Sequence, residues 1–401
     1  MPLRILTVVF PVILLGWLVL PAALGAQQEE AIQAETSAEY SFGQALRLSL
    51  AAEAASPIQR VTLFLNAPEL PNTLTADVDF PIADEIDVNH VIDLTQLRLA
   101  PFTTVTYWWT VKDEDGNEVE TDRQKIEYVD DQFAWREIER DGVQIFWTGD
   151  EPAVGQGALD AVVNALPEIR AIMPSEPPSP LRIYVYPTAA DLRSGLRLTG
   201  RDWVGAHAHP ELGVILVSAG SPVTAATDLA RTIPHELAHL YLYQATGVGY
   251  KSTPVWLDEG LASLLESEPN PFYATKLQEA AVAGETIALS DLCYTFPTDD
   301  EAVLLAYAQS ADMIRYIQSR YGNQALRQMI VDLADGADCE TVTERSLGIS
   351  MATLNQNWLD QVAPQSLLER VWRNGRVGLA IIVAGFLLLV LLVALPRGRD
   401  S

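Results

Sequence analysis

Alternating apolar and polar residues dominate the chain from about residue 36 to 130. Arg60 to Asn66 alternates in this way, and Thr103 to Lys112 is rich in β-branched and aromatic residues. A turn at Asp115 to Asn117 separates this second run from a further alternating run that ends at Tyr128. A period of two residues indicates half-buried strands, and two such runs around a turn predict a hairpin. The sequence therefore predicts a small β-sandwich of immunoglobulin or fibronectin type over 36–130.

The pattern changes after residue 130. Leu181 to Tyr186 and Gly213 to Ser218 are short apolar runs that are typical of buried strands. From there to Val362 the apolar residues have mostly the spacing of helices. Strands followed by helices predict an α+β domain over 131–364.

Both ends of the chain carry segments directed to a membrane. Residues 1–26 have a positive residue, Arg4, then an apolar stretch and several small residues, which is the layout of a secretory signal peptide. An uncleaved N-terminal anchor is the alternative. Residues 377–395 are nineteen residues without a charge, enough for a transmembrane helix. Together the two segments predict a single-pass protein of the cell membrane, with its folded domains on the extracytoplasmic side.

Composition narrows the choice of partners. The 401 residues include 53 Asp and Glu against 26 Lys and Arg, a formal net charge of -27. A surface this acidic repels phosphate, which argues against nucleic acid as a partner.

Cys293 and Cys339 are the two cysteines, so the β-sandwich has no disulfide of its own. Export permits a bond between them, and two free buried thiols are the alternative.

The candidate chemistry of the second domain is concentrated in the HELAH motif of residues 235–239. On a helix, His235 and His239 lie on one face, so both imidazoles can bind the same metal ion. Zn²⁺ suits neutral imidazole ligands and keeps an open coordination position in catalytic sites. Glu236 lies where it can reach a water at that position. Pro234 either falls in the first turn of this helix or kinks it.

A third protein ligand is predicted on a second helix. The segment 254–265 reads PVWLDEGLASLL, with Pro254 suited to a first helical turn. Glu259 lies twenty residues after His239, enough for a turn and an antiparallel return. Together, His235, His239 and Glu259 would form a two-histidine, one-glutamate zinc site. The alternative is a solvated helix carboxylate, but the neighbours of Glu259 are mostly apolar or small.

HELAH followed by WLDEGLAS resembles the gluzincin metallopeptidases, and the stretch of about 179–364 is most similar to their peptidase MA-like group. This resemblance implies a zincin-like fold with zinc bound by the three predicted ligands. It also implies that Glu236 is the general base for peptide hydrolysis. A tyrosine from a downstream helix, here Tyr307, would stabilise the developing oxyanion. A position in the helical core is the alternative for Tyr307.

The chain departs from the aminopeptidase branch of these enzymes, in which a G-x-M-E-N strand carries a glutamate for the substrate amino group. The comparable segment, 205–211, reads GAHAHPE and has no glutamate at the matching position. We therefore expect an endopeptidase rather than an aminopeptidase, with this segment as an edge strand beside an extended substrate. His207 and His209 of this strand face the same side. Three roles are open for them: ordinary edge-strand residues, a hydrogen-bond donor to the oxyanion, or part of a second metal site. Asp258 takes the place of an asparagine common in that branch.

Two classes of function remain open from the sequence. The first is a membrane-anchored, extracytoplasmic zinc metallopeptidase that acts on peptides or proteins. The second is a surface-displayed binding or adhesion protein whose zinc domain is a scaffold. The intact motif favours the enzyme, because a scaffold does not need Glu236. The β-sandwich is then either a spacer or a substrate-binding module.

Overall fold

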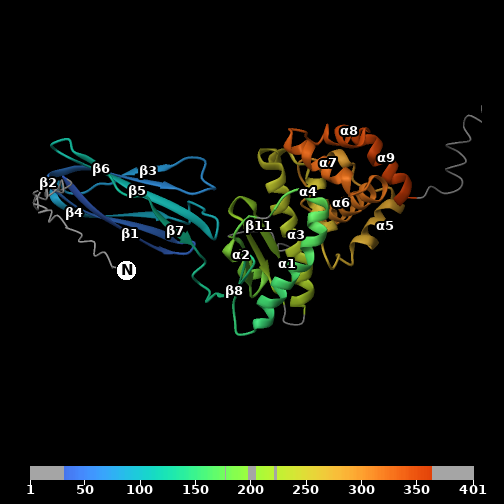
Figure 1. Cartoon of the computed structure of the whole chain (residues 1–401), viewed down its shortest axis with the longest axis horizontal. Helices are drawn as coiled ribbons and strands as arrows, with labels where there is room; N and C mark the ends of the chain where they lie inside the picture. The colour runs from blue at the N-terminus through green and yellow to red at the C-terminus, as the bar shows by residue number, and fades with distance from the viewer. Residues whose placement is uncertain (1–30, 177, 197–204, 221–223, 364–401) are drawn as a thin grey trace, which may run out of the picture.

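The protein, as a computed structural model, is described over residues 31–176, 178–196, 205–220 and 224–363. These residues form a β-domain followed by a larger domain of sheet and helices (Figure 1). The predicted membrane-directed segments, 1–26 and 377–395, lie outside the described residues. Within the part that the structure describes, no helix is both long and apolar enough to cross a membrane.

The N-terminal domain is built of strands, as predicted; they form one hydrogen-bonded sheet of seven strands, and the domain is called the β-sandwich below. Its strands are β1 (Ile32–Ser41), β2 (Ala45–Asn66), β3 (Leu74–Asp77), β4 (Ala83–Asp93), β5 (Thr103–Asp113), β6 (Glu118–Glu120) and β7 (Gln124–Tyr128). The first part of β2 pairs with β1 and β4, and its second part pairs with β3 and β5. The register of β2 shifts between Glu53 and Arg60, around Pro57, which has no N–H for a ladder hydrogen bond. The long strand β2 therefore has different neighbours along its two halves.

The domain begins earlier than the sequence pattern indicates. The predicted start was residue 36, whereas β1 already pairs with β2 from Ile32. Along β1, partly buried positions alternate with exposed ones after Ile32. Gln33 and Glu35 are exposed, so the first residues of this edge strand read as a polar leader in the sequence.

The second domain is built on a five-stranded sheet in the order β11-β12-β10-β9-β8. Its strands are β8 (Arg136–Arg140), β9 (Val143–Trp147), β10 (Leu181–Tyr186), β11 (Ala206–His209) and β12 (Val214–Ser218). The central strands β9, β10 and β12 are parallel, and both edge strands are antiparallel to their neighbours. Parallel neighbours need a crossover, which α1 (Pro152–Ile172) and α2 (Ala189–Gly195) provide. The predicted run of helices after Ser218 is present, whereas earlier in the domain helices alternate with strands.

The helices after the sheet carry most of the core. They are α3 (Ala225–Thr246), α4 (Val255–Leu264), α5 (Tyr273–Ala283), α6 (Asp300–Tyr321), α7 (Asn323–Ala334), α8 (Val342–Leu347) and α9 (Met351–Val362). Three short 3-10 turns accompany the fold, η1 (Pro210–Leu212), η2 (Gly247–Ser252) and η3 (Leu289–Leu292). Cys293, after η3, and Cys339, between α7 and α8, form a disulfide. The alternative of two free thiols is therefore wrong.

The two faces of the sheet pack against different partners. One set of alternating residues, including Ile183 and Val185, faces α1 and α3 in the main core. The other set, including Tyr184 and Tyr186, packs with Phe102, which immediately precedes β5 of the sandwich. The ring of Phe102 is fully buried and stacks on Tyr184 with 3.4 Å between centroids. This aromatic cluster joins the two domains on the sheet face away from α1.

Candidate active site

Helix α3 carries the HELAH motif. It runs without interruption through Pro234, so the proline neither starts nor ends the helix. His235 and His239 are one turn apart and lie on the same face, with 5.1 Å between their ring centroids. Glu236 lies between them in sequence and is buried. Because α3 contacts β11, β12 and α4, this part of the helix lies between the sheet and the helical half.

Helix α4 brings Glu259 to the two histidines. Its Oε2 atom lies 3.4 Å from His235 Nε2 and 3.8 Å from His239 Nε2. The three candidate ligand atoms all lie within 4.8 Å of one another. Ligands about 2.0–2.1 Å from a tetrahedral zinc ion would be about 3.3–3.4 Å apart. Glu259 Oε2 is buried without a hydrogen-bond partner among the described residues, so the donor set and its spacing fit a zinc ion.

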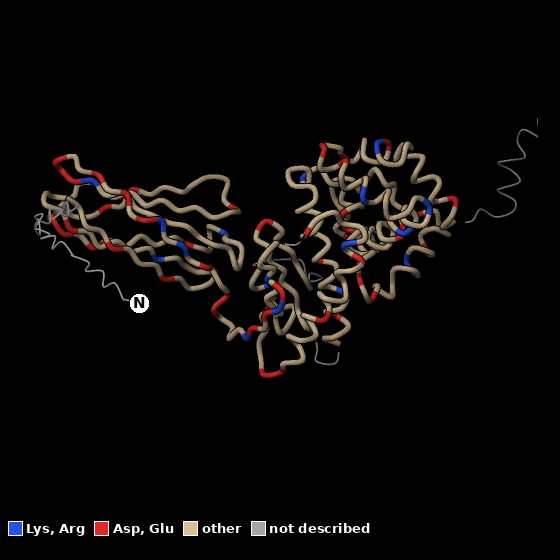
Figure 2. The backbone as a smooth tube through the Cα atoms, in the orientation of Figure 1, with Lys and Arg blue, Asp and Glu red and all other residues tan. Residues whose placement is uncertain are grey.

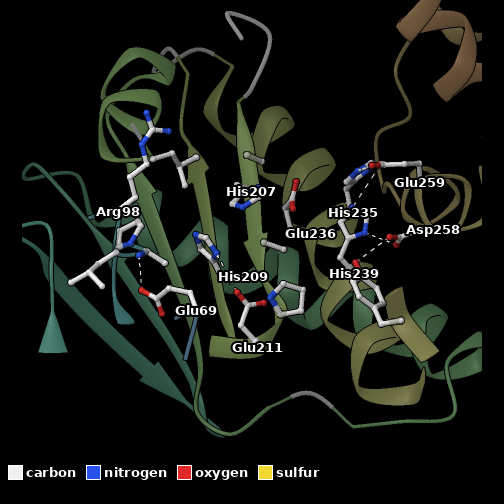
Figure 3. Close-up of a pocket in the computed structure, with 18 of the residues that line it drawn as sticks. Glu69, Arg98, His207, His209, Glu211, His235, Glu236, His239, Asp258 and Glu259 are labelled. Carbon is white, nitrogen blue, oxygen red and sulfur yellow. Dashed lines mark hydrogen bonds and ion pairs between the residues drawn. The ribbon is translucent and has the colours of Figure 1, made fainter. Parts of the chain in front are cut away.

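Each histidine is oriented by a second carboxylate. His235 Nδ1 lies 3.2 Å from Glu266 Oε1, and His239 Nδ1 lies 2.6 Å from Asp258 Oδ1. The hydroxyl of Tyr250 donates to the other oxygen of Asp258 at 3.0 Å. A carboxylate at Nδ1 holds the proton there and leaves Nε2 free to bind a metal. Both Nε2 atoms therefore face the oxygen of Glu259 (Figure 3).

Sequence reasoning missed Glu266 and Tyr250 and gave Asp258 no role. Glu266 lies seven residues after Glu259, about two helical turns, which would place it on a similar face. However, α4 ends at Leu264, so helical periodicity alone does not place Glu266. The available signal was the general need of a metal-binding imidazole for an acceptor at its other nitrogen.

The carboxylates around His235 and His239 stabilise positive charge at this site. Burial lowers the pKa of His239, but Asp258 and Glu259 outweigh it and raise that pKa to about 9. For His235, burial likewise lowers the pKa, but the nearby carboxylates of Glu259 and Glu266 outweigh it and raise the pKa well above its ordinary value. Burial raises the pKa of the Glu236 carboxyl. This electrostatic environment favours binding of a divalent cation.

Tyr307 is placed at the same centre. It comes from α6, and its ring centroid lies 6.3 Å from that of His235 and 5.1 Å from that of Phe296. Burial raises its pKa well above the ordinary value, and the charges of Glu259 and Glu236 add to this effect. Its hydroxyl therefore stays protonated and able to donate. The side chain lines the cavity described below, which sets it apart from a tyrosine confined to the core.

Strand β11 forms one wall beside the motif. The rings of His207 and His209 meet edge to face, with 4.6 Å between centroids. Among the described residues, the one group of three or more potential metal ligands is His235, His239 and Glu259, so the β11 histidines do not form a second such group. Glu211 was also missed by sequence reasoning. Its Oε1 lies 3.8 Å from His209 Nδ1, and the interaction with His209 lowers the pKa of its carboxyl.

These walls enclose a cavity of about 660 Å³. One end holds the histidines of α3 with Glu236 and Glu259, and β11 with η1 lines the middle (Figure 3). The other end is formed by the β-sandwich, which contributes Glu69 and the segment 98–101. A cleft of this size holds several residues of an extended peptide. The metal centre, the edge strand and the sandwich therefore line one continuous space.

Comparison with known proteins agrees with this geometry. A family model described as the Peptidase MA superfamily matches residues 161–364, which is half of the 401-residue chain. A search of curated proteins gave no match.

Some solved structures are distantly similar. A substrate-bound M1 zinc metallopeptidase from Deinococcus radiodurans is 12% identical, with a TM-score of 0.39, and 82% of this chain and 93% of that chain are covered. A two-domain M1 zinc metallopeptidase bound to L-arginine is 11% identical, with a TM-score of 0.37 and the same coverage. An aminopeptidase N family protein from Idiomarina loihiensis is 9% identical, with a TM-score of 0.37, covering 84% of this chain and 75% of that one. At such low TM-scores these similarities support no conclusion about activity.

Proposed function

From the premise that this chain belongs to the Peptidase MA superfamily and is a zinc-dependent peptide hydrolase, we propose that it is a membrane-anchored endopeptidase acting outside the cytoplasm. In this proposal His235, His239 and Glu259 bind zinc, and Glu236 is the general base. The observation that carries it is the convergence of three ligand atoms within 4.8 Å beside a buried glutamate. The anchoring rests on the sequence of 1–26 and 377–395 alone.

The residues divide the work of hydrolysis between them. A bound zinc ion supplies Lewis-acid chemistry, which polarises a peptide carbonyl and acidifies water. Glu236 accepts a proton from the attacking water and later donates it to the leaving amine nitrogen. Tyr307 donates a hydrogen bond to the oxygen on which negative charge develops. Asp258 and Glu266 keep the imidazoles in the required tautomer and orientation.

The endopeptidase part of the proposal rests on β11 and the shape of the cavity. Ala208, not a glutamate, occupies the strand position at which an aminopeptidase would hold the substrate amino group. The cavity continues past β11 to the β-sandwich, which leaves space for substrate residues beyond the metal. Glu211 favours the aminopeptidase alternative, because its carboxylate also lines this space.

A cleavage profile tests the proposal. The zinc-loaded full chain in detergent is incubated with a diverse peptide library, and products are identified by mass spectrometry. We expect internal cuts that disappear in a Glu236→Gln variant with unchanged zinc content. Removal of single N-terminal residues alone would replace the endopeptidase with the aminopeptidase alternative. If Glu236→Gln cleaves like wild type, Glu236 is not the base.

Anchoring is tested separately by membrane fractionation of the full chain and of a chain shortened after residue 370. We expect only the full chain to remain with membranes after a high-salt wash. Equal release of both chains would contradict the predicted C-terminal anchor.

A further inference from the structure

We propose that Arg98 of the β-sandwich is a specificity-determining residue that binds a carboxylate of the peptide substrate. The inference rests on the proposed peptidase function and extends it to the substrate class. It assigns the β-sandwich the second of the two roles that the sequence left open, a substrate-binding module rather than a spacer.

Arg98 faces the same space as the metal centre. It lines the cavity together with Leu99, Ala100 and Pro101. Figure 3 shows Arg98 at the end of this cavity opposite to His235 and His239, with His207 and His209 between them. A peptide that extends through this cavity from the metal centre, past β11, would therefore approach Arg98.

The segment that carries Arg98 is fixed to the sandwich by Glu69. The carboxylate of Glu69 accepts a hydrogen bond from the backbone N–H of Ala100 at 2.8 Å and another from the Thr103 hydroxyl at 2.9 Å. Leu99, next to Arg98, is buried. Glu69 thus has local donors for both oxygens, and it positions the segment instead of pairing with Arg98.

The same segment is also fixed to the catalytic domain. Phe102 has a φ of 65°, a left-handed conformation that is uncommon for a residue other than glycine. That conformation is held by complete burial of its ring against Tyr184 of β10. Attachment to both domains through Ala100, Phe102 and Thr103 keeps residues 98–101 at this end of the cavity, so the position of Arg98 is a consequence of the fold.

The charge of Arg98 is available to a ligand. It is the one Lys or Arg among the described residues that line the cavity, and its side chain is exposed. No ion pair or hydrogen bond joins its guanidinium to another residue of the described part. A guanidinium presents its N–H donors in a planar fork that matches a carboxylate. In a chain with a net charge of -27, this single cation gives the cleft a local site for an acidic group.

Peptide binding tests the assignment without relying on turnover. Fluorescent peptides in matched pairs, with Glu or Gln at successive positions and with a free or amidated C-terminus, are titrated into the zinc-loaded full chain bearing Glu236→Gln. We expect the carboxylate-bearing member of at least one pair to bind about threefold to tenfold more tightly, the range between an exposed and a partly desolvated charge pair. The two sets of pairs distinguish an acidic side chain from the C-terminal carboxylate.

Substitutions at Arg98 identify the source of this preference. Arg98→Ala in the same background should bring the ratio of dissociation constants close to one, and Arg98→Lys should retain part of it. Arg60→Ala, which removes an exposed arginine of the same domain outside the cavity, should leave the ratio unchanged. A wild-type ratio of one, or a ratio that Arg98→Ala does not change, would overturn the proposal. Neither result depends on whether the active chain cleaves peptides, so failure of the peptidase assignment would be seen separately in the cleavage profile.

Discussion

At the scale of single residues, the proposed metal centre is supported by carboxylates that contact its histidines and are not among its predicted ligands. Glu266 and Asp258 each occupy the Nδ1 side of one imidazole. Glu266 is buried, and Asp258 is partly buried where it lines the cavity. A buried carboxylate without a partner would be costly, so each pair stabilises the carboxylate and orients the ligand at once.

Replacing Glu266 with Gln should weaken zinc binding. The amide can still accept a hydrogen bond, but the negative charge that strengthens imidazole as a ligand is lost. We expect about a tenfold lower affinity, the lower end of the range for such supporting residues, measured by competition with a chelator. Glu279→Gln, an exposed change on α5, is the control. Equal affinities in both variants would show that Glu266 does not tune the site.

Replacing Tyr307 with Phe should separate catalysis from metal binding. Loss of one donor to a developing oxyanion lowers kcat by about 10²–10³ in comparable sites. Zinc content should stay at the wild-type level, because the three predicted ligands are untouched. Tyr294→Phe, whose side chain is 73% exposed, controls for loss of a hydroxyl elsewhere. A fall in zinc content that matches the fall in rate would show that Tyr307 supports Glu259 instead.

The site residues that could be identified from the sequence are those that lie close to one another along the chain. His235, Glu236 and His239 are neighbours on one helix, so their common face follows from helical geometry. Predicting that Glu259 lies beside them required only a second helix and a connecting turn. Arg98 comes from the other domain, and Glu211 comes from the turn that follows the edge strand β11. Their distance to the metal centre is set by tertiary packing, to which periodicity gives no access.

At the scale of elements, the position of Glu259 depends on how closely α4 approaches α6. Gly260 follows Glu259, and a Cβ built on it would lie 2.7 Å from the carbonyl oxygen of Ser310 and 2.7 Å from Ile314 Cγ1. Such a contact is too short for any side chain. The glycine therefore sets the depth of α4, and with it the reach of the predicted ligand.

Gly260→Ala should both destabilise the domain and disturb the metal centre. We expect a loss of about 1–3 kcal/mol in the free energy of unfolding together with weaker zinc binding, measured by denaturant unfolding and chelator competition. Gly157→Ala on α1 is the matched control, because nothing lies within 4 Å of its added Cβ. There we expect a gain of about 0.5–1 kcal/mol from helix propensity. A Gly260→Ala chain as stable as this control would contradict the packing argument.

Elements were easier to predict where their neighbours are close in sequence. The hairpin formed by β5 and β6 joins Val111 to Val119, as the turn at Asp115 to Asn117 indicates. By contrast, β2 exchanges its partners halfway along its length. The alternating pattern specifies that β2 is a strand and which residues it buries, but it contains no information about which strand lies beside it.

At the scale of the whole molecule, acidic residues are distributed over both domains (Figure 2). One acidic residue, Asp130, lies between the domains and is fully buried. The hydroxyl of Tyr186 donates to its Oδ2 at 3.1 Å, and Trp135 Nε1 donates to its backbone carbonyl at 2.8 Å. Burial raises the pKa of this carboxyl despite the hydrogen bonds that its oxygens accept from the backbone N–H of Gln132 and the hydroxyl of Tyr186.

Asp130 should give the protein a distinct dependence on pH. A carboxyl with a raised pKa in the folded state binds its proton more tightly there than in the unfolded chain. Its contribution to stability is complete below the ordinary carboxyl pKa of about 3.9 and is lost as the pH rises through the raised pKa. Relative to wild type, Asp130→Asn should gain stability with rising pH across this window, measured by unfolding at a series of pH values. A constant difference between the two chains would contradict the raised pKa.

The stacking of Phe102 on Tyr184 also bears on the order in which the parts of the protein fold. During synthesis, N-terminal domains generally fold first, so the sandwich is complete before α3 and α4 have been made. This finished sandwich lines the cavity only once Phe102 has packed against the sheet of the second domain. A chain that has folded its second domain but not yet docked Phe102 would hold zinc in an open-sided cleft. The three predicted ligands all lie in the second domain, so metal binding does not need the docked sandwich, whereas the selectivity proposed for Arg98 does.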